Sequence, residues 1–223
     1  ALPQAQAHYL GSVMRLKPGA EVRLFNGKSC EWLAEITQIS KREAGLTAKA
    51  CLRPQMTAPD IWLLFAPVKK HRNNFIVEKA TELGVARIWP IQTARTTAKI
   101  RTDKLPAHVI EAAEQTERLD LPVVSAPIKL ETLLLDWDAV RTLVFADEES
   151  ADETLAPAVQ ALAAIKAPAA ILIGPEGGFT PQERAALRAK SFVKPINLGP
   201  RILRADTAAV AALALWQAVS GDW

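Results

Sequence analysis

The chain has 223 residues, of which 49% are hydrophobic and 23% are charged, and its formal net charge is +3. This composition is that of a globular protein with one large domain or two smaller ones, and it excludes disordered, collagen-like and coiled-coil chains. Because no apolar run reaches the roughly 18 residues of a membrane span, and the first residues lack a secretion-signal pattern, we expect a soluble cytoplasmic protein without membrane partners.

The first segment has the alternating pattern of β-structure. Alternating apolar residues occur in three runs, over residues 21–25, 32–39 and 46–52. Asn26-Gly27 lies between the first two runs and is a strong hairpin signal. Residues 53–59 then contain two prolines and no periodicity, which indicates a linker. We therefore predict an all-β domain over residues 1–58 and a second domain over residues 59–223.

The second domain alternates short apolar runs with helical periodicity. The spacing predicts strands over residues 61–66, 85–91, 142–146 and 169–173, and near 196. It predicts helices over residues 71–83, near 105–119 and near 152–165, from Pro181, and from about 206. Strands that alternate with helices form a mostly parallel sheet covered on both faces, so the fold class is α/β.

The two cysteines, Cys30 and Cys51, are too few for a disulfide framework or a four-ligand zinc site. We expect both to be free thiols in a reducing compartment. His8 and His108 have no cysteine or histidine at ligand spacing, and we expect no metal site. Trp32, Trp62 and Trp89 lie in strand patterns, so we expect core tryptophans there although they could also stack on a base.

Charge is distributed unevenly along the chain. Residues 1–130 contain 19 Lys and Arg against 12 Asp and Glu, whereas residues 131–223 contain 8 against 12. A basic N-terminal part is what a polyanionic partner requires, although solvated surface lysines produce the same count.

Glycine is scarce, yet three of the ten glycines lie within Gly174-Pro175-Glu176-Gly177-Gly178. This loop follows a strand, at the edge of an open α/β sheet where ligands bind. Thr180-Pro181-Gln182-Glu183 then supplies an N-cap, a proline at the first helical position and the glutamate of a capping box. The loop is therefore expected to be fixed at both ends.

The glycine loop matches neither the P-loop nor the dinucleotide-binding pattern. The carboxylate of Glu176 would repel a phosphate about 4 Å away by roughly 4 kcal/mol at an effective dielectric near 20. A neutral or cationic ligand such as S-adenosylmethionine suits the loop better, because glycines leave backbone groups accessible. A tight turn with its acid in water is the alternative.

A second loop, residues 197–207, joins the strand near 196 to the last helix. It combines Arg201 and Arg204 with the turn at Gly199-Pro200. A surface position for Arg201, and a capping role for Asp206 or Thr207, are simpler interpretations of this loop alone. The two loops together favour a ligand site.

The two loops, with motifs elsewhere in the chain, resemble the RsmE family of the SPOUT superfamily, methyltransferases that modify N3 of a uridine in small-subunit ribosomal RNA. The resemblance covers nearly the whole chain, and the matching segments are Ile171–Phe179, Leu198–Arg204, Glu78–Val85, Pro90, Glu114-Gln115 with Arg118, and His8–Leu16 with Phe25-Asn26-Gly27. It implies a small N-terminal PUA-like β-barrel that binds RNA, a C-terminal SPOUT-type α/β domain with a trefoil knot, and a homodimer. Asp206 stands where the family more often has glutamate.

The resemblance also implies that S-adenosylmethionine binds in the two loops. The implied cofactor-binding residues are Leu172, Ile173, Gly174, Glu176, Gly177, Gly178, Leu198, Gly199, Ile202, Leu203, Arg204 and Thr207. Since uridine N3 is a poor nucleophile until it loses its proton, we expect Arg204 to stabilise the charge that develops on the pyrimidine carbonyls. We expect Glu176 to hold the cofactor or to accept the proton. A structural ion pair between these two side chains is the alternative.

The implied substrate is small-subunit ribosomal RNA, free or within the 30S particle. Basic residues that can neutralise its phosphates are Arg15, Lys69, Lys70, Arg72, Arg95 and Arg118. We expect His71, Lys99 and Arg101 to be solvated instead. Two other functions stay open at this point: a non-catalytic RNA-binding module for ribosome assembly, and an enzyme that acts on a nucleotide phosphate.

Overall fold

The computed structural model describes residues 1–147 and 157–223, with the side chain of Lys70 left out. The chain divides into two compact units, Ala1–Thr57 and Ala58–Trp223. Among the described helices, none is both long and apolar enough to cross a membrane.

The N-terminal unit contains a three-stranded antiparallel sheet, and the predicted hairpin is confirmed. Its strands, in the order β1-β2-β3, are β1 (Glu21–Leu24), β2 (Glu31–Ile39) and β3 (Ala44–Arg53). In the β1–β2 connection the side-chain oxygen of Asn26 accepts hydrogen bonds from the backbone N–H groups of Lys28 and Ser29, both at 2.9 Å. Gly27 has a φ of 70°, a conformation that few other residues adopt readily.

The prediction that residues 1–58 are all β is wrong at the beginning of the chain. A short helix, α1 (Gln4–His8), continues as the wider turns of a π-helix over Tyr9–Val13. Ala7 and Leu10, three residues apart, are its buried positions. The alternation that indicated β-structure begins only at residue 21, and five-residue helical segments are too short to produce a clear period.

The prediction of free thiols is also wrong, because Cys30 and Cys51 form a disulfide with their Cα atoms 5.6 Å apart. The register of the sheet explains the pairing. Trp32 of β2 lies opposite Cys51 of β3, so Cys30, which directly precedes β2, comes close to the same cysteine. The expectation of a reducing compartment, which depended on free thiols, loses its basis.

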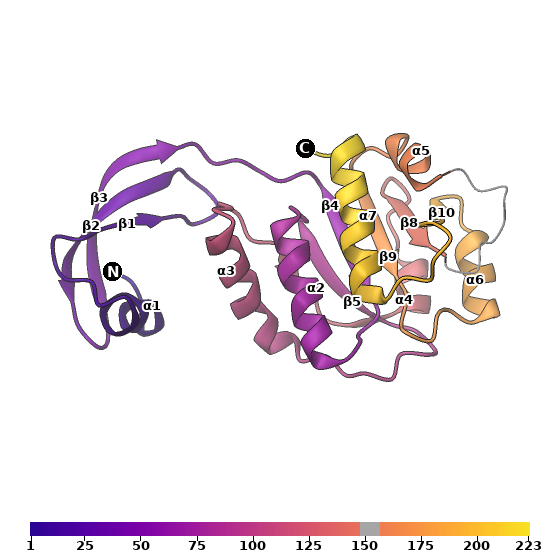
Figure 1. Ribbon diagram of the computed structural model, residues 1–223, viewed down its shortest axis with the longest axis horizontal. Helices are drawn as coiled ribbons and strands as arrows, with labels where there is room; N and C mark the ends of the chain where they lie inside the picture. Colours follow the sequence, from indigo (N-terminus) through magenta and orange to yellow (C-terminus); the bar gives the residue numbers. More distant parts are fainter. Residues whose placement is uncertain (148–156) are drawn as a thin grey trace. The chain divides into compact units, whose positions relative to one another are not determined.

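The C-terminal unit is built on a parallel sheet, as predicted. Its main strands, in the order β10-β8-β9-β4-β5-β6, are β10 (Val193–Ile196), β8 (Thr142–Ala146), β9 (Ala169–Ile173), β4 (Ile61–Phe65), β5 (Arg87–Gln92) and β6 (Val123–Val124). The two-residue strand β7 (Ile128–Lys129) also pairs with β5 in parallel. Figure 1 shows β4 and β9 in the centre of this unit.

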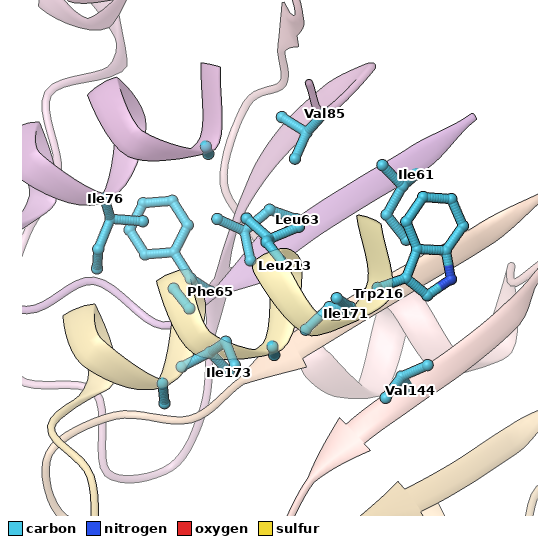
Figure 2. Close-up of a cluster of buried hydrophobic side chains, with 14 of the residues drawn as sticks. Ile61, Leu63, Phe65, Ile76, Val85, Val144, Ile171, Ile173, Leu213 and Trp216 are labelled. Atoms are coloured by element: carbon cyan, nitrogen blue, oxygen red, sulfur yellow. The ribbon is translucent and has the colours of Figure 1, made fainter. Parts of the chain in front are cut away.

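Helices cover both faces of this sheet. The first face packs against α2 (Lys70–Glu82), α3 (Leu105–Gln115), α5 (Ala158–Ala163) and α7 (Ala205–Ser220), and the second against α4 (Leu130–Leu135) and α6 (Pro181–Arg188). Alternate residues of β4 explain the two clusters, because Leu63 and Phe65 face α2 and α7 whereas Leu64 faces α4 and α6. Figure 2 shows the first cluster, with Leu213 and Trp216 of α7 against the sheet.

Most elements of the second unit agree with their predicted positions, with four omissions. The strands β6 and β7, the helix α4 and the 3₁₀ helix η2 (Thr102–Lys104) were not predicted, because each is six residues or shorter. The helix predicted near 152–165 is found as α5 from Ala158, and residues 148–156 of that prediction lie outside the described residues.

The tryptophans predicted to be core are half-buried. Trp62 and Trp89 lie edge to face on the α4 and α6 side of the sheet, with ring centroids 6.0 Å apart. The guanidinium carbon of Arg141 lies 3.7 Å from the ring centroid of Trp62, and this stacking explains why the ring stays at the margin of the core.

Candidate active site

The candidate site lies at the carboxyl ends of the central strands. β4 and β9 run in parallel, and the backbone N–H of Ala66 donates a hydrogen bond to the carbonyl oxygen of Ile173 at 3.0 Å. The segments that follow these strands therefore leave the same edge of the sheet. This is the edge at which α/β proteins bind ligands.

The glycine loop after β9 requires glycine for two reasons. A Cβ atom on Gly174 would lie 2.6 Å from Cε2 of Phe179, so a side chain cannot fit there without displacing the ring. Gly178 has a φ of 66°, and its N–H donates a hydrogen bond to the carbonyl oxygen of Pro175 at 2.9 Å. The loop is thus a tight turn closed by Phe179.

The predicted capping box at the start of α6 is confirmed. The hydroxyl of Thr180 accepts a hydrogen bond from the N–H of Glu183 at 3.2 Å, and the carboxylate of Glu183 accepts one from the N–H of Thr180 at 2.9 Å. The second carboxylate oxygen of Glu183 accepts a hydrogen bond from the N–H of Ala94 at 2.7 Å. Glu183 therefore also ties the loop to the segment after β5, which the sequence pattern did not indicate.

Arg95 makes a second connection to the same loop. Its Nη1 atom donates a hydrogen bond to the carbonyl oxygen of Gly177 at 2.8 Å. The sequence predicted a phosphate contact for Arg95, whereas the structure places its guanidinium on the backbone of the glycine loop.

The second predicted loop leads from β10 to α7. The N–H of Gly199 donates a hydrogen bond to the side chain of Asn197 at 2.8 Å, and Gly199 has a φ of 111°. Leu198 and Leu203 are half-buried against the core, whereas Ile202 between them is 84% exposed. The loop is therefore anchored near both ends and presents its middle to solvent.

Arg72, near the N-terminus of α2, connects the two loops. Its Nη1 atom donates to Oε1 of Glu176 in the glycine loop. Its Nε atom lies 3.7 Å from Oδ2 of Asp206 in the first turn of α7. The side chain of Arg72 is only 17% exposed. The carboxylates of both loops thus lie within reach of one guanidinium, so the two loops form a single site.

Asn73 explains how Arg72 is positioned, and no sequence pattern indicated this role. Asn73 is buried, and its side-chain oxygen accepts a hydrogen bond from the N–H of Val68 at 2.8 Å. Its side-chain nitrogen donates to the carbonyl oxygen of the same residue at 2.9 Å. This pair of bonds closes the β4–α2 connection and fixes the residue before it.

Glu176 pairs with Arg72, so the alternative of an ion pair between Glu176 and Arg204 is wrong. Arg204 is the N-cap residue of α7, and its carbonyl oxygen accepts a hydrogen bond from Ala208 at 2.8 Å. Its side chain is exposed and has no ion pair within residues 1–147 and 157–223. It is available to a ligand.

The predicted cofactor-binding residues differ in how exposed they are to a ligand. Leu172 and Ile173 are buried in the clusters on opposite faces of the sheet, so only their backbone can meet a ligand. The half-buried members are Gly174, Leu198 and Leu203, and Gly178 is buried. The exposed members are Glu176, Gly177, Gly199, Ile202, Arg204 and Thr207.

The predicted RNA-binding residues also separate into groups. Lys69 is exposed at the N-cap of α2, and Arg15 is exposed in the N-terminal unit. The side chain of Arg118 is only 8% exposed and donates to the carbonyl oxygens of Thr81 at 2.8 Å and Val85 at 2.7 Å. Arg118 therefore stabilises the end of α2, and this position does not support a contact with RNA.

Two family models match the chain. Residues 2–47 match the RNA methyltransferase PUA domain, and residues 56–217 match the RNA methyltransferase domain. Ribosomal RNA small subunit methyltransferase E of Rickettsia conorii is 33% identical over 208 residues, which are 93% of this chain and 84% of that protein. The protein of the same name from Synechocystis is 33% identical over 216 residues, or 96% of this chain and 71% of that protein.

Solved structures agree with these matches. Ribosomal RNA small subunit methyltransferase E from Neisseria gonorrhoeae, bound to S-adenosyl methionine, superposes with a TM-score of 0.85 at 28% identity, covering 100% of this chain and 92% of that one. A putative methyltransferase from Legionella pneumophila, in complex with the same cofactor, gives 0.86 at 29% identity with the same coverage. The chain is therefore an RNA methyltransferase with an N-terminal PUA-like domain, and it belongs to the family of ribosomal RNA small subunit methyltransferase E.

Proposed function

We propose that this protein transfers a methyl group from S-adenosylmethionine to N3 of a uridine in small-subunit ribosomal RNA. The family supplies the reaction class, and the two solved relatives bind the cofactor. The observation that carries the proposal is the contact of Arg72 with both Glu176 and Asp206, which assembles the site from the two loops.

The residues of the site fit this cofactor. Glu176 and Asp206 contribute two negative charges against the one positive charge of Arg72, so the cluster favours a cation and disfavours a phosphate. A Cβ atom on Gly199 would meet nothing within 4 Å, and Gly177 is exposed, so backbone groups of both loops are accessible. When bound, S-adenosylmethionine supplies a methyl group on a positively charged sulfur.

Arg204 is the catalytic residue of the proposal. Uridine N3 becomes nucleophilic as its proton passes to solvent water, and negative charge then develops on the adjacent carbonyl oxygens. Because Arg204 is exposed at the N-cap of α7, two residues before Asp206, and its guanidinium is unpaired among the described residues, it can donate hydrogen bonds to those oxygens. Since Arg72 already occupies one oxygen of Glu176, we assign Glu176 to holding the cofactor rather than to accepting the proton.

We extend the proposal to RNA binding and architecture. Lys69 and Lys70 follow β4 and would contact phosphates, and Arg15 would do so from the N-terminal unit. The match to the PUA domain supports an RNA-binding β-barrel over residues 1–58, and the family supports a knotted methyltransferase domain over residues 59–223. A homodimer belongs to the proposal because the family resemblance implies one. A ribosomal RNA substrate would place the reaction in the cytoplasm.

The decisive experiment is mass spectrometry of small-subunit ribosomal RNA from cells that lack the gene. We expect the loss of one N3-methyluridine and its return when the gene is restored. Calorimetry with S-adenosylhomocysteine separates the alternatives. RNA binding without any heat from this ligand would indicate a non-catalytic assembly module, and binding of ATP would indicate a nucleotide enzyme.

A further inference from the structure

We propose that Arg72 is a positioning residue whose guanidinium sets the distance between the glycine loop, residues 174–180, and the first turn of α7. The residue would organise the cofactor site and would not contact RNA. The expected effect of Arg72 on cofactor binding rests on the function proposed above. The expected effect of Arg72 on the order of the two loops does not depend on that function.

The geometry explains why a single residue can have this effect. Arg72 lies after β4, Glu176 after β9, and Asp206 in the first turn of the helix that follows β10, so three separate parts of the chain meet at one guanidinium. Two carboxylates that share this space repel each other unless a cation lies between them. The planar fork of arginine can serve both, whereas the single ammonium of lysine cannot do so with the same geometry.

Burial makes the Arg72–Asp206 pair of this cluster stronger than an ordinary surface pair, whereas the side chain of Glu176 is 48% exposed. The side chains of Arg72 and Asp206 are 17% and 19% exposed, so solvent and salt screen their interaction less than that of exposed ions. The base of Arg72 is fixed, because its N–H donates to the carbonyl oxygen of Lys69 at 2.9 Å and the next residue, Asn73, closes the loop. The backbone of Arg72 is therefore fixed, and this limits the positions that its guanidinium can take.

The same contacts argue against the phosphate contact that the sequence predicted for Arg72. A phosphate that approached the guanidinium would meet the carboxylates of Glu176 and Asp206. If Arg72 did neutralise a phosphate, its removal would weaken RNA binding and would reduce the salt dependence of binding by about one ion.

The first experiment compares the full chain with Arg72→Gln, Arg72→Lys and Arg101→Gln. Arg101 serves as the control, because it is 71% exposed and pairs with a neighbour, Asp103, that is also exposed. Hydrogen exchange is measured on the ligand-free proteins over residues 174–180 and 197–207. We expect faster exchange in both segments for Arg72→Gln, an intermediate result for Arg72→Lys, and no change for the control.

The second experiment measures binding of S-adenosylhomocysteine by calorimetry. Arg72→Gln should weaken binding about tenfold, and Arg72→Lys should recover part of the loss. In a Glu176→Gln/Asp206→Asn background, Arg72→Gln should cause no further loss, since its partners are gone. The KM for RNA and its salt dependence should stay unchanged.

Unchanged exchange and ligand binding, combined with a higher KM for RNA, would overturn the proposal in favour of a phosphate contact. If Arg72→Gln fails to fold, Arg72→Lys keeps the charge and decides the same question through exchange in the two segments. If the unmodified protein does not bind S-adenosylhomocysteine, the proposed function fails, while the exchange data still determine whether Arg72 holds the loops.

Discussion

Arg95 donates a hydrogen bond from Nη1 to the carbonyl oxygen of Gly177 at 2.8 Å, although the two residues lie 82 positions apart in the sequence. The N–H of the preceding residue, Ala94, donates to Glu183 at 2.7 Å. Two consecutive residues after β5 thus hold the glycine loop at its middle and at its end. A residue that the sequence assigned to RNA is therefore a support of the glycine loop.

We therefore predict that Arg95→Gln weakens binding of S-adenosylhomocysteine. The loss should be about fivefold, the value of one hydrogen bond near 1 kcal/mol. Calorimetry at two salt concentrations checks this, because the support of a loop should not depend on salt as a phosphate contact does. A normal affinity for the ligand, together with weaker RNA binding, would restore the original assignment.

For Arg204→Ala we predict a loss of methyl transfer with little change in cofactor affinity. Removal of a donor that stabilises developing charge typically lowers kcat by about 10²–10³-fold. Single-turnover assays at saturating cofactor measure this effect, and Arg201→Ala, at an exposed position three residues earlier, is the matched control. Full activity of Arg204→Ala would remove the residue from its catalytic role.

Arg118→Gln should lower stability without changing RNA binding. The substitution removes the guanidinium donor from the carbonyl oxygens of Thr81 and Val85, and it leaves Asp120 without its cation. The oxygen of Thr81 keeps only the hydrogen bond from the N–H of Gly84, at 3.1 Å. We expect a loss of about 2 kcal/mol in the free energy of unfolding, or roughly 4–8 °C in Tm. Urea denaturation measures the first value, and a filter-binding titration with RNA should match that of the unmodified protein.

Glu114 on α3 provides a prediction about pH. Burial raises the pKa of Glu114, and the nearby charge of Glu111 raises it further. The folded protein thus favours the protonated carboxyl more than the unfolded chain does, so this group disfavours folding increasingly as pH rises above the ordinary value of 4.5.

Glu114→Gln should therefore raise stability at pH 7 by no more than about 0.5 kcal/mol. The gain should shrink as the pH is lowered to about 4, where most of the carboxyl is protonated in both states. Urea denaturation at the two pH values tests the sign. A gain that grows at acidic pH would contradict it.

The disulfide between Cys30 and Cys51 should stabilise the N-terminal unit. It spans 21 positions, and closing a loop of this size in the unfolded chain is worth about 3 kcal/mol. We expect dithiothreitol, or the double change Cys30→Ser/Cys51→Ser, to lower the unfolding temperature of this unit. Mass spectrometry of the alkylated, unreduced protein gives a direct check, and two alkylated cysteines would show that the bond is absent.

The sequence predicted the elements whose pattern is long and regular. The strand over residues 142–146 and the capping box of Thr180 and Glu183 follow from hydrophobic runs and local capping chemistry, and both lie where they were expected. The helix α4 is only six residues long, and its three buried leucines read equally well as part of a strand. Hydrophobic patterns and capping residues therefore predict most of the helices and strands, whereas a helix as short as α4 has too few turns for its period to be recognised.

The candidate site was predictable as two loops but not as a set of contacts. Glycine clustering indicated the loop around Gly177, and the sheet rule placed it at a ligand-binding edge. Arg72, Arg95 and Arg118 all appeared as free surface cations, yet each forms an ion pair or a hydrogen bond to the backbone with a residue distant in the sequence. Those partners depend on strand order, which a single sequence does not reveal.

The meeting of Arg72, Glu176 and Asp206 also sets an order of events during synthesis of the chain. The first of these residues leaves the ribosome well before the third, because Arg72 and Asp206 lie 134 positions apart in the sequence. Until α7 has emerged, the growing polypeptide lacks one of the two carboxylates around the guanidinium. We therefore expect the two loops to be joined only after α7 has been synthesised.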